Sequence, residues 1–257
     1  MKSGICKLCL KQRELCDSHA LPNSAFKYIF RQSEGKAVVL TDDTKTPIKT
    51  SSDSWSDYLL CLDCEKNLND DFDQYGIAVF RGEKGKTKII DVGVSFSDVD
   101  KQRLRMFFLS LLWRISISPH DSYRNIDLPY ALEEELRDAL ADGKKIRGSL
   151  CTVAIYRLHD STKTSGFSHD GLREIIASPF ARKYDNGQVS ICFLFFGYFV
   201  EIFISKLPTK YLNRPGVISG DGNIFLAPNQ EILEVKEIVS TLARSLQKHD
   251  SGLSKID

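Results

Sequence analysis

The chain has 257 residues, of which 42% are hydrophobic and 27% charged, and its formal net charge is +1. This composition is ordinary for a soluble globular protein with one large domain or two small ones. The small net charge argues against a protein that coats nucleic acid without specificity, although it is compatible with a local basic face.

Two Cys-x-x-Cys pairs lie in the first quarter of the chain, Cys6 with Cys9 and Cys61 with Cys64. Each pair presents two thiolates on one tight turn, and two pairs complete the closed four-sulfur shell that structural zinc prefers. The N-terminus has no charged lead followed by an apolar stretch, so we expect no secretory signal. We therefore predict a cytoplasmic, reducing location, in which these cysteines bind Zn²⁺ rather than form disulfides.

The segment between the two pairs contains Ser18-His19-Ala20-Leu21-Pro22. Closing a zinc site at both ends pins residues 10–60 into a loop, which brings His19 close to the metal. Phe26–Phe30 is apolar and predicts a short helical or extended patch. Residues 33–56 are polar and predict a hairpin or a mobile loop, and Glu65–Phe72 has helical composition.

A charged, glycine-punctuated stretch, Arg81–Lys86, is the candidate boundary of this first unit. Beyond it the pattern is helical. A helix capped by Asp98 or Asp100 is expected to run to about Ile117, with apolar residues at the offsets of one buried face. A second helix is expected from near Pro129 to Gly143.

The rest of the chain, residues 146–257, is expected to contain strands and a last helix. Residues 150–158 form one predicted strand, and Val189–Ser205 predicts two buried strands, or one long bent strand, broken at Gly197. The run Val189–Ser205 is too short to span a bilayer and contains Glu201, so we expect no membrane segment. A short strand at 224–226 and an amphipathic helix over 231–246 complete the chain. The sequence thus predicts an α+β protein with a zinc-binding unit over residues 1–82, a helical segment over 83–145 and a mixed α/β C-terminal domain over 146–257.

The motif order Cys-x-x-Cys, Ser-His-x-x-Pro and Leu-Leu-Cys-x-x-Cys-Glu, over about residues 4–73, resembles the HNH (His-Me finger) endonuclease superfamily in its zinc-ribbon form. The segments 107–116 and 135–137 also resemble a bacterial protein family that carries the same N-terminal knuckle. The resemblance implies an HNH-like ββα unit, a β-hairpin and a helix whose ends are stapled by the cysteine pairs.

By this resemblance, His19 matches the general base that activates water, while Ser18 and Glu65 match ligands of a catalytic Mg²⁺ or Mn²⁺. A neutral imidazole can accept a proton from water near pH 7, and a hard cation offsets the charge that builds on phosphate. The four-thiolate zinc has no open position and would only hold the frame.

Two positions depart from the family pattern. An aspartate usually precedes the histidine where this chain has Ser18, and Asp17 could replace it only with a shift of strand register. The middle position, often asparagine, falls near Ser56 or Asp57.

Each candidate residue also has a structural interpretation. His19 could complete a shell with three thiolates, and Cys16 could also enter the shell. Glu65 could be a solvated carboxylate favoured by a helix dipole. Arg114 could reach a phosphate, but an ion pair with Glu135 on the next helix is the interpretation that we favour. The other histidines, His120, His159, His169 and His249, are expected at the surface.

The leading hypothesis is a metal-dependent HNH-type endonuclease that hydrolyses phosphodiester bonds of DNA, with a role in bacterial defence. The C-terminal part would then recognise the substrate, a protein partner in a defence complex, or a signal. The alternative is a non-catalytic zinc-knuckle adaptor that binds protein or nucleic acid. No membrane partner is expected, and the sequence predicts no oligomeric state.

Overall fold

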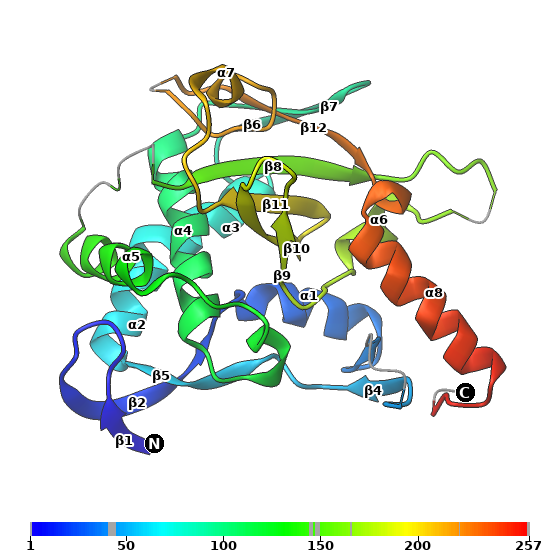
Figure 1. The fold of residues 1–257 in the computed structure, drawn as a ribbon, viewed down its shortest axis with the longest axis horizontal. Helices are drawn as coiled ribbons and strands as arrows, with labels where there is room; N and C mark the ends of the chain where they lie inside the picture. Colours follow the sequence, from blue (N-terminus) through cyan, green and yellow to red (C-terminus); the bar gives the residue numbers. More distant parts are fainter. Residues whose placement is uncertain are drawn as a thin grey trace.

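The computed structural model describes residues 2–40, 45–143, 146, 150–164, 166–220 and 222–255. It is a mixed α+β protein, as predicted, with a small antiparallel sheet near the N-terminus and a large mixed sheet built from the rest of the chain (Figure 1). The four cysteines of the predicted zinc site lie together near the N-terminus.

The small sheet has the strand order β1-β2-β5, in which β1 is Lys2–Ile5, β2 is Gln12–His19 and β5 is Ser56–Cys61. Between β2 and β5 the chain forms helix α1 (Asn23–Gln32) and a hairpin of β3 (Ala37–Val39) with β4 (Lys49–Ser51). The apolar patch that the sequence left open is therefore helical, because Ala25, Phe26 and Ile29 recur at the spacing of one buried helix face.

A continuous helical run follows β5. It consists of α2 (Leu62–Leu68), a π-helical turn η1 (Asn69–Asp73) and α3 (Gln74–Phe80). The wider turn occurs where the run must bury both Phe72 and the carboxylate of Asp73. Helical composition predicted the first half of this run but not its extension through α3.

The large sheet has seven strands in the order β6-β7-β12-β8-β11-β10-β9, and only β12 and β8 run parallel among its pairs. The strands in chain order are β6 (Lys86–Ile90), β7 (Gly93–Ser97), β8 (Thr152–His159), β9 (Phe180–Lys183), β10 (Val189–Phe195), β11 (Tyr198–Phe203) and β12 (Phe225–Glu231). The apolar run Val189–Ser205 thus forms the two strands of a hairpin, β10 and β11, that turns at Phe196–Gly197.

Strands β6 and β7 occupy a stretch that we expected to be a boundary followed by helix. The β-branched residues Thr87, Ile89 and Ile90 favour a strand, but the neighbouring lysines and glycines weaken that signal. Close packing explains Gly93, because its φ is +153° and a Cβ there would lie 2.2 Å from the Ala227 carbonyl oxygen on β12.

The two predicted helices after β7 are confirmed. Helix α4 (Lys101–Ile117) begins after Asp100, whose side chain accepts a 2.9 Å hydrogen bond from the Arg103 N–H. Helix α5 (Tyr130–Asp142) ends at Gly143, which has φ of +64°. The last helix, α8, spans Lys236–Asp250 and starts later than predicted because 225–231 continues as strand β12. Shorter turns complete the chain: η2 (Asp121–Tyr123), α6 (His169–Arg173), α7 (Thr209–Leu212) and η3 (Ile232–Glu234).

The two faces of the large sheet are buried against different elements. Ile191, Phe193 and Phe195 of β10 belong to the main core, whereas Cys192 and Leu194 belong to a second cluster that includes residues of α8. Because alternate residues of a strand point to opposite faces, α8 covers one face and the main core fills the other.

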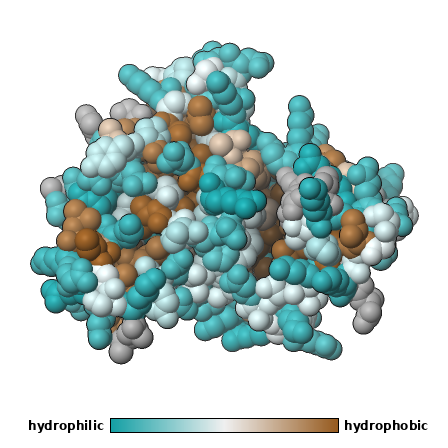
Figure 2. Space-filling view, turned by 60° about the horizontal axis from the view of Figure 1, so that its bottom comes forward, coloured by the Kyte–Doolittle hydropathy of each residue, from teal (hydrophilic) through white to brown (hydrophobic). Residues whose placement is uncertain are grey.

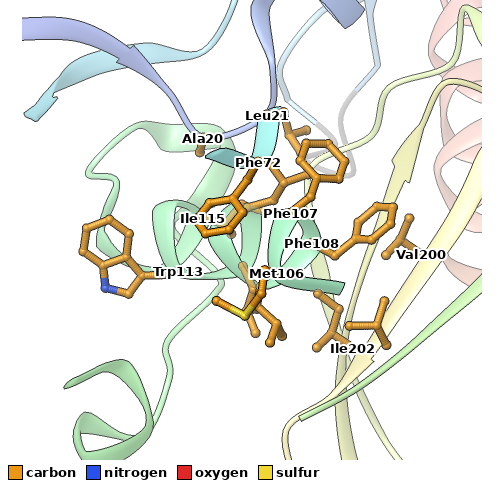
Figure 3. Close-up of a cluster of buried hydrophobic side chains, with 14 of the residues drawn as sticks. Ala20, Leu21, Phe72, Met106, Phe107, Phe108, Trp113, Ile115, Val200 and Ile202 are labelled. Atoms are coloured by element: carbon orange, nitrogen blue, oxygen red, sulfur yellow. The ribbon is translucent and has the colours of Figure 1, made fainter. Parts of the chain in front are cut away.

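Helix α4 lies at the centre of the main core (Figure 3). Its Phe107 and Phe108 lie between Ala20 and Leu21 of the N-terminal unit and Val200 and Ile202 of β11. One apolar cluster therefore includes residues from all three predicted segments, and the boundaries near 82 and 145 stay predictions. Among the described residues, no helix is both long enough and apolar enough to cross a bilayer.

Candidate metal centre and adjacent site

The four cysteines are brought together by the ends of three elements. Cys6 and Cys9 lie in the turn after β1, Cys61 ends β5 and Cys64 is in the first turn of α2. The turn is closed by the Leu10 N–H, which donates to the Cys6 carbonyl oxygen at 2.9 Å, and Leu10 adopts a φ of +58°. It is held against β5 by the Lys7 N–H, which donates to the Leu59 carbonyl oxygen at 3.0 Å.

The sulfur geometry is that of a metal-binding shell. All four Sγ atoms lie within 4.8 Å of one another, and Cys9 Sγ lies 4.0 Å from Cys61 Sγ. Zinc–sulfur bonds of about 2.3 Å in a tetrahedron place the sulfurs about 3.8 Å apart. The Cys61 N–H also donates to Cys6 Sγ at 3.3 Å, which holds this sulfur against the start of α2. These residues could hold a metal ion such as zinc.

The shell is partly shielded from solvent, and burial, together with the neighbouring sulfurs, raises the pKa of the Cys64 thiol above its usual value. Four thiolates at this separation repel one another, so a divalent cation is the natural compensating charge. Neither His19 nor Cys16, the two alternative ligands, belongs to the cluster that the described residues form.

His19 is the last residue of β2 and pairs with Ser56 across the sheet. Its Nε2 lies 2.9 Å from Ser54 Oγ, and its carbonyl oxygen accepts a 3.1 Å hydrogen bond from Arg114 Nη1. Burial lowers the pKa of the imidazole, and the carboxylate of Asp17 only partly opposes that effect. The ring is therefore neutral at pH 7 and fixed in place at both its side chain and its backbone.

The side chains of Ser18, on β2, and Glu65, on α2, lie next to each other. Ser18 is 1% exposed, and its Oγ accepts a 3.3 Å hydrogen bond from the Leu60 N–H. Burial raises the pKa of Glu65, while the guanidinium of Arg114 and the Ser18 hydroxyl act in the opposite direction. Glu65 Oε2 is buried and has no hydrogen-bond partner. Glu65 therefore lies in the first turn of α2, as the alternative interpretation has it, but one of its carboxylate oxygens is removed from solvent.

A buried ion pair lies next to His19 and Glu65. Arg114, 1% exposed, donates to both carboxylate oxygens of Asp73 at 2.9 and 2.6 Å, and Asp73 is 7% exposed. Arg114 thus binds a carboxylate on η1 and the backbone of β2, so the predicted pairing with Glu135 is wrong. The sequence favoured Glu135 because it lies on the next helix, whereas the actual partner lies 41 residues earlier on η1.

The structure also adds residues that the sequence reasoning missed. Ser54, not Ser56 or Asp57, contacts the His19 ring. The adjacent Asp53 carboxylate lies 3.1 Å from Nε2 of His120, whose Nδ1 accepts a hydrogen bond from the Ser122 N–H at 3.1 Å. The side chain of His120 is only 18% exposed, so it is not a free surface histidine. No local sequence pattern predicts this contact, because Asp53 and His120 are 67 residues apart.

Comparison of the chain with protein-family models, with curated proteins and with solved structures gives no match. The interpretation of this site therefore depends on the geometry described above.

Proposed function

We propose that the protein is a metal-dependent endonuclease of the HNH type that hydrolyses phosphodiester bonds in DNA. One observation carries the proposal. Strand β5, which pairs antiparallel with β2, leads directly into α2, and this strand pair and helix bring Ser18, near the end of β2, beside Glu65 of α2, with His19 next in the chain. The four-cysteine cluster at the base would fix the two strands and the helix relative to one another.

His19 would act as the general base. Its ring is held neutral by burial and oriented by Ser54, so it can accept the proton of a water molecule that attacks phosphorus. The hydrogen bond from Arg114 to the His19 carbonyl oxygen would fix the backbone from which the imidazole projects. The electron pair of the water oxygen forms the new P–O bond, and the leaving alkoxide departs from the opposite side of phosphorus.

The donor set is compatible with a catalytic Mg²⁺ or Mn²⁺. Glu65 offers a buried carboxylate oxygen without a partner, and Arg114 is engaged by Asp73 rather than by Glu65. Mg²⁺ in proteins often takes one or two carboxylates, several waters and substrate phosphate oxygens. Glu65 and the Ser18 hydroxyl would hold such an ion, which would offset charge on the reacting phosphate.

A basic surface next to His19 supports a nucleic-acid substrate. Helix α1 begins four residues after His19, contains no acidic residue and exposes Lys27 and Arg31 four residues apart on one face. The charge of Lys27 reaches His19, where it contributes to lowering the imidazole pKa. These two cations would bind backbone phosphates on either side of the cut, which is a sequence-independent contact.

The test is plasmid cleavage by the full-length protein with Mg²⁺ or Mn²⁺. His19→Ala is expected to lower cleavage about 10²–10⁴-fold, the usual contribution of a general base, with unchanged zinc content. His249→Ala, on the exposed face of α8, is the matched control and should cleave as wild type. Mn²⁺ binding measured by electron paramagnetic resonance should be lost in Glu65→Gln, which tests the metal ligand without relying on activity.

A second candidate, a non-catalytic zinc adaptor, is favoured by one observation. Three large apolar side chains around the cysteine cluster, Ile5, Leu10 and Leu62, are largely exposed. Figure 2 shows apolar groups in separate patches among hydrophilic ones on the face that it displays. Zinc-loaded protein that cleaves neither single- nor double-stranded DNA with either metal would favour the adaptor and overturn the nuclease. A cytoplasmic defence complex, with the C-terminal part binding a protein partner, would suit either function.

A further inference from the structure

A cavity at the N-terminal end of α4 has the chemistry of a phosphate site. It measures about 240 Å³ and lies between the start of α4, the start of β8 and the segment after α7. Its charged lining residues are Lys101 and Arg105, and no carboxylate lines it among the described residues. This cavity is separate from the site around His19. Gln102 lines the cavity and Arg114 contacts His19, and the two are twelve residues apart on α4, roughly 18 Å along the helix. The inference therefore does not depend on the proposed function.

Two cations line the cavity, and both are held in position. The Lys101 ammonium donates to the Ser219 carbonyl oxygen at 2.6 Å, which fixes the segment that forms the opposite wall. Arg105 is 5% exposed and donates to the carbonyl oxygens of Ile146 and Cys151, each at 2.9 Å. Burial lowers the pKa of Arg105, so the cavity wall carries a cation at a cost in desolvation.

A third feature is a hydrogen-bond donor without a partner. Gln102 lines the same cavity, and its Nε2 is buried and makes no hydrogen bond. An unsatisfied buried donor costs about 1–3 kcal/mol, so such groups in native proteins call for a specific explanation. The Nε2 has almost no accessible surface, so an acceptor bound in the cavity would satisfy it once the Gln102 side chain turns its amide toward the opening. The first N–H groups of α4 point to the same end of the helix and add a partial positive charge.

A second, outer cavity of about 450 Å³ adjoins this inner one and shares Lys101, Gln102 and Gly220 with it. This outer cavity is lined by Asp98, Asp100 and Asn223 in addition. Carboxylate and amide oxygens accept hydrogen bonds from sugar hydroxyls, and they repel a second anionic group.

We propose that this double cavity binds a phosphorylated sugar or nucleoside, with the phosphate against Lys101, Gln102 and Arg105 and the hydroxylated remainder against Asp98 and Asp100. Phosphate fits the inner cavity better than a carboxylate does. It has more oxygens, which can accept hydrogen bonds from the Lys101 ammonium and the Gln102 amide while facing the Arg105 guanidinium.

The experiment is calorimetric titration of the full-length protein with ribose 5-phosphate, inorganic phosphate and ribose. Ribose 5-phosphate should bind most tightly, phosphate more weakly, and ribose without detectable heat. Gln102→Leu keeps the side-chain size and removes the donor, so it should weaken ribose 5-phosphate binding about tenfold. Lys101→Met should do at least the same. Lys88→Met removes an exposed lysine from β6 and is the charge control, with a change below about twofold.

The unliganded Gln102→Leu protein provides an independent readout. Without ligand it should melt at a higher temperature than wild type, because it no longer buries an unsatisfied amide, and it should lose the thermal stabilisation that ribose 5-phosphate gives to wild type. The proposal is overturned if wild type shows no saturable binding of ribose 5-phosphate or phosphate up to about 10 mM. A dissociation constant above that concentration would be far weaker than that of a specific site. It is equally overturned if Gln102→Leu and Lys101→Met bind as wild type does.

Discussion

The ion pair between Arg114 and Asp73 should be a main determinant of stability, because both partners are almost fully buried. Arg114 makes two charge-assisted hydrogen bonds to Asp73, at 2.9 and 2.6 Å, and one to the His19 carbonyl oxygen at 3.1 Å. Removing one partner of a buried pair leaves an uncompensated charge and costs about 3–5 kcal/mol. Either Arg114→Met or Asp73→Leu should therefore remove much of a total stability of about 5–15 kcal/mol.

The double variant should be less damaged than the sum of the two singles. When both charges are absent, the remaining loss comes from the His19 carbonyl oxygen and from imperfect packing, about 2–4 kcal/mol. The coupling energy between Arg114 and Asp73 is then at least about 2–3 kcal/mol. Urea unfolding of wild type, the two single variants and the double variant, followed by circular dichroism, measures all four free energies in one cycle. Additivity within about 0.5 kcal/mol would refute the reasoning, because it would mean that the two charges do not compensate each other.

Three further outcomes are expected. Cys61→Ser should lower bound zinc from one equivalent to well below one by a metallochromic assay and destabilise the protein, whereas Cys16→Ser should keep full zinc, since its sulfur lies outside the four-cysteine cluster. Gly76→Ala should destabilise the protein by about 1–3 kcal/mol in urea unfolding, because the new Cβ would lie 2.4 Å from the Phe107 ring; an unchanged midpoint would contradict this packing. A hydrogen bond from a β9 arginine lowers the pKa of Glu237, so this carboxylate stabilises the fold above its usual pKa of about 4.5 and loses that effect as pH falls through the folded value. Glu237→Gln should therefore reduce the unfolding free energy by up to about 1 kcal/mol at pH 7 and by less near pH 3, which parallel pH titrations of stability would measure.

The elements that the sequence predicted well are those whose signals are local. The cap at Asp100, the left-handed Gly143 and the break at Gly197 each depend on a few neighbouring residues, and the structure has an element end or a turn at each. The cysteine spacing likewise predicts a cluster, because a Cys-x-x-Cys turn is itself a local structure.

The misassigned features depend on distant partners. Strands β6 and β7 have weak patterns of their own, and they exist because β12, more than 120 residues later, pairs with β7. The partner of Arg114 could not be predicted either, because residues on an adjacent predicted helix are only one of many groups that a central helix contacts. The same holds for the contact of Asp53 with His120.

These long-range contacts have a consequence for the candidate site itself. The end of β2 is held by two groups from beyond residue 82: Arg114 donates to the His19 carbonyl oxygen, and the Tyr123 hydroxyl accepts from the Leu21 N–H at 3.4 Å. A metal ion held by the four cysteines would fix the far end of the strand, near Cys6 and Cys61, but β2 places His19 several residues away from that cluster. Strand ends without tertiary contacts fray, so the metal alone does not determine where the imidazole lies. The four-cysteine unit and helix α4 therefore position His19 together, and each supplies a constraint that the other lacks.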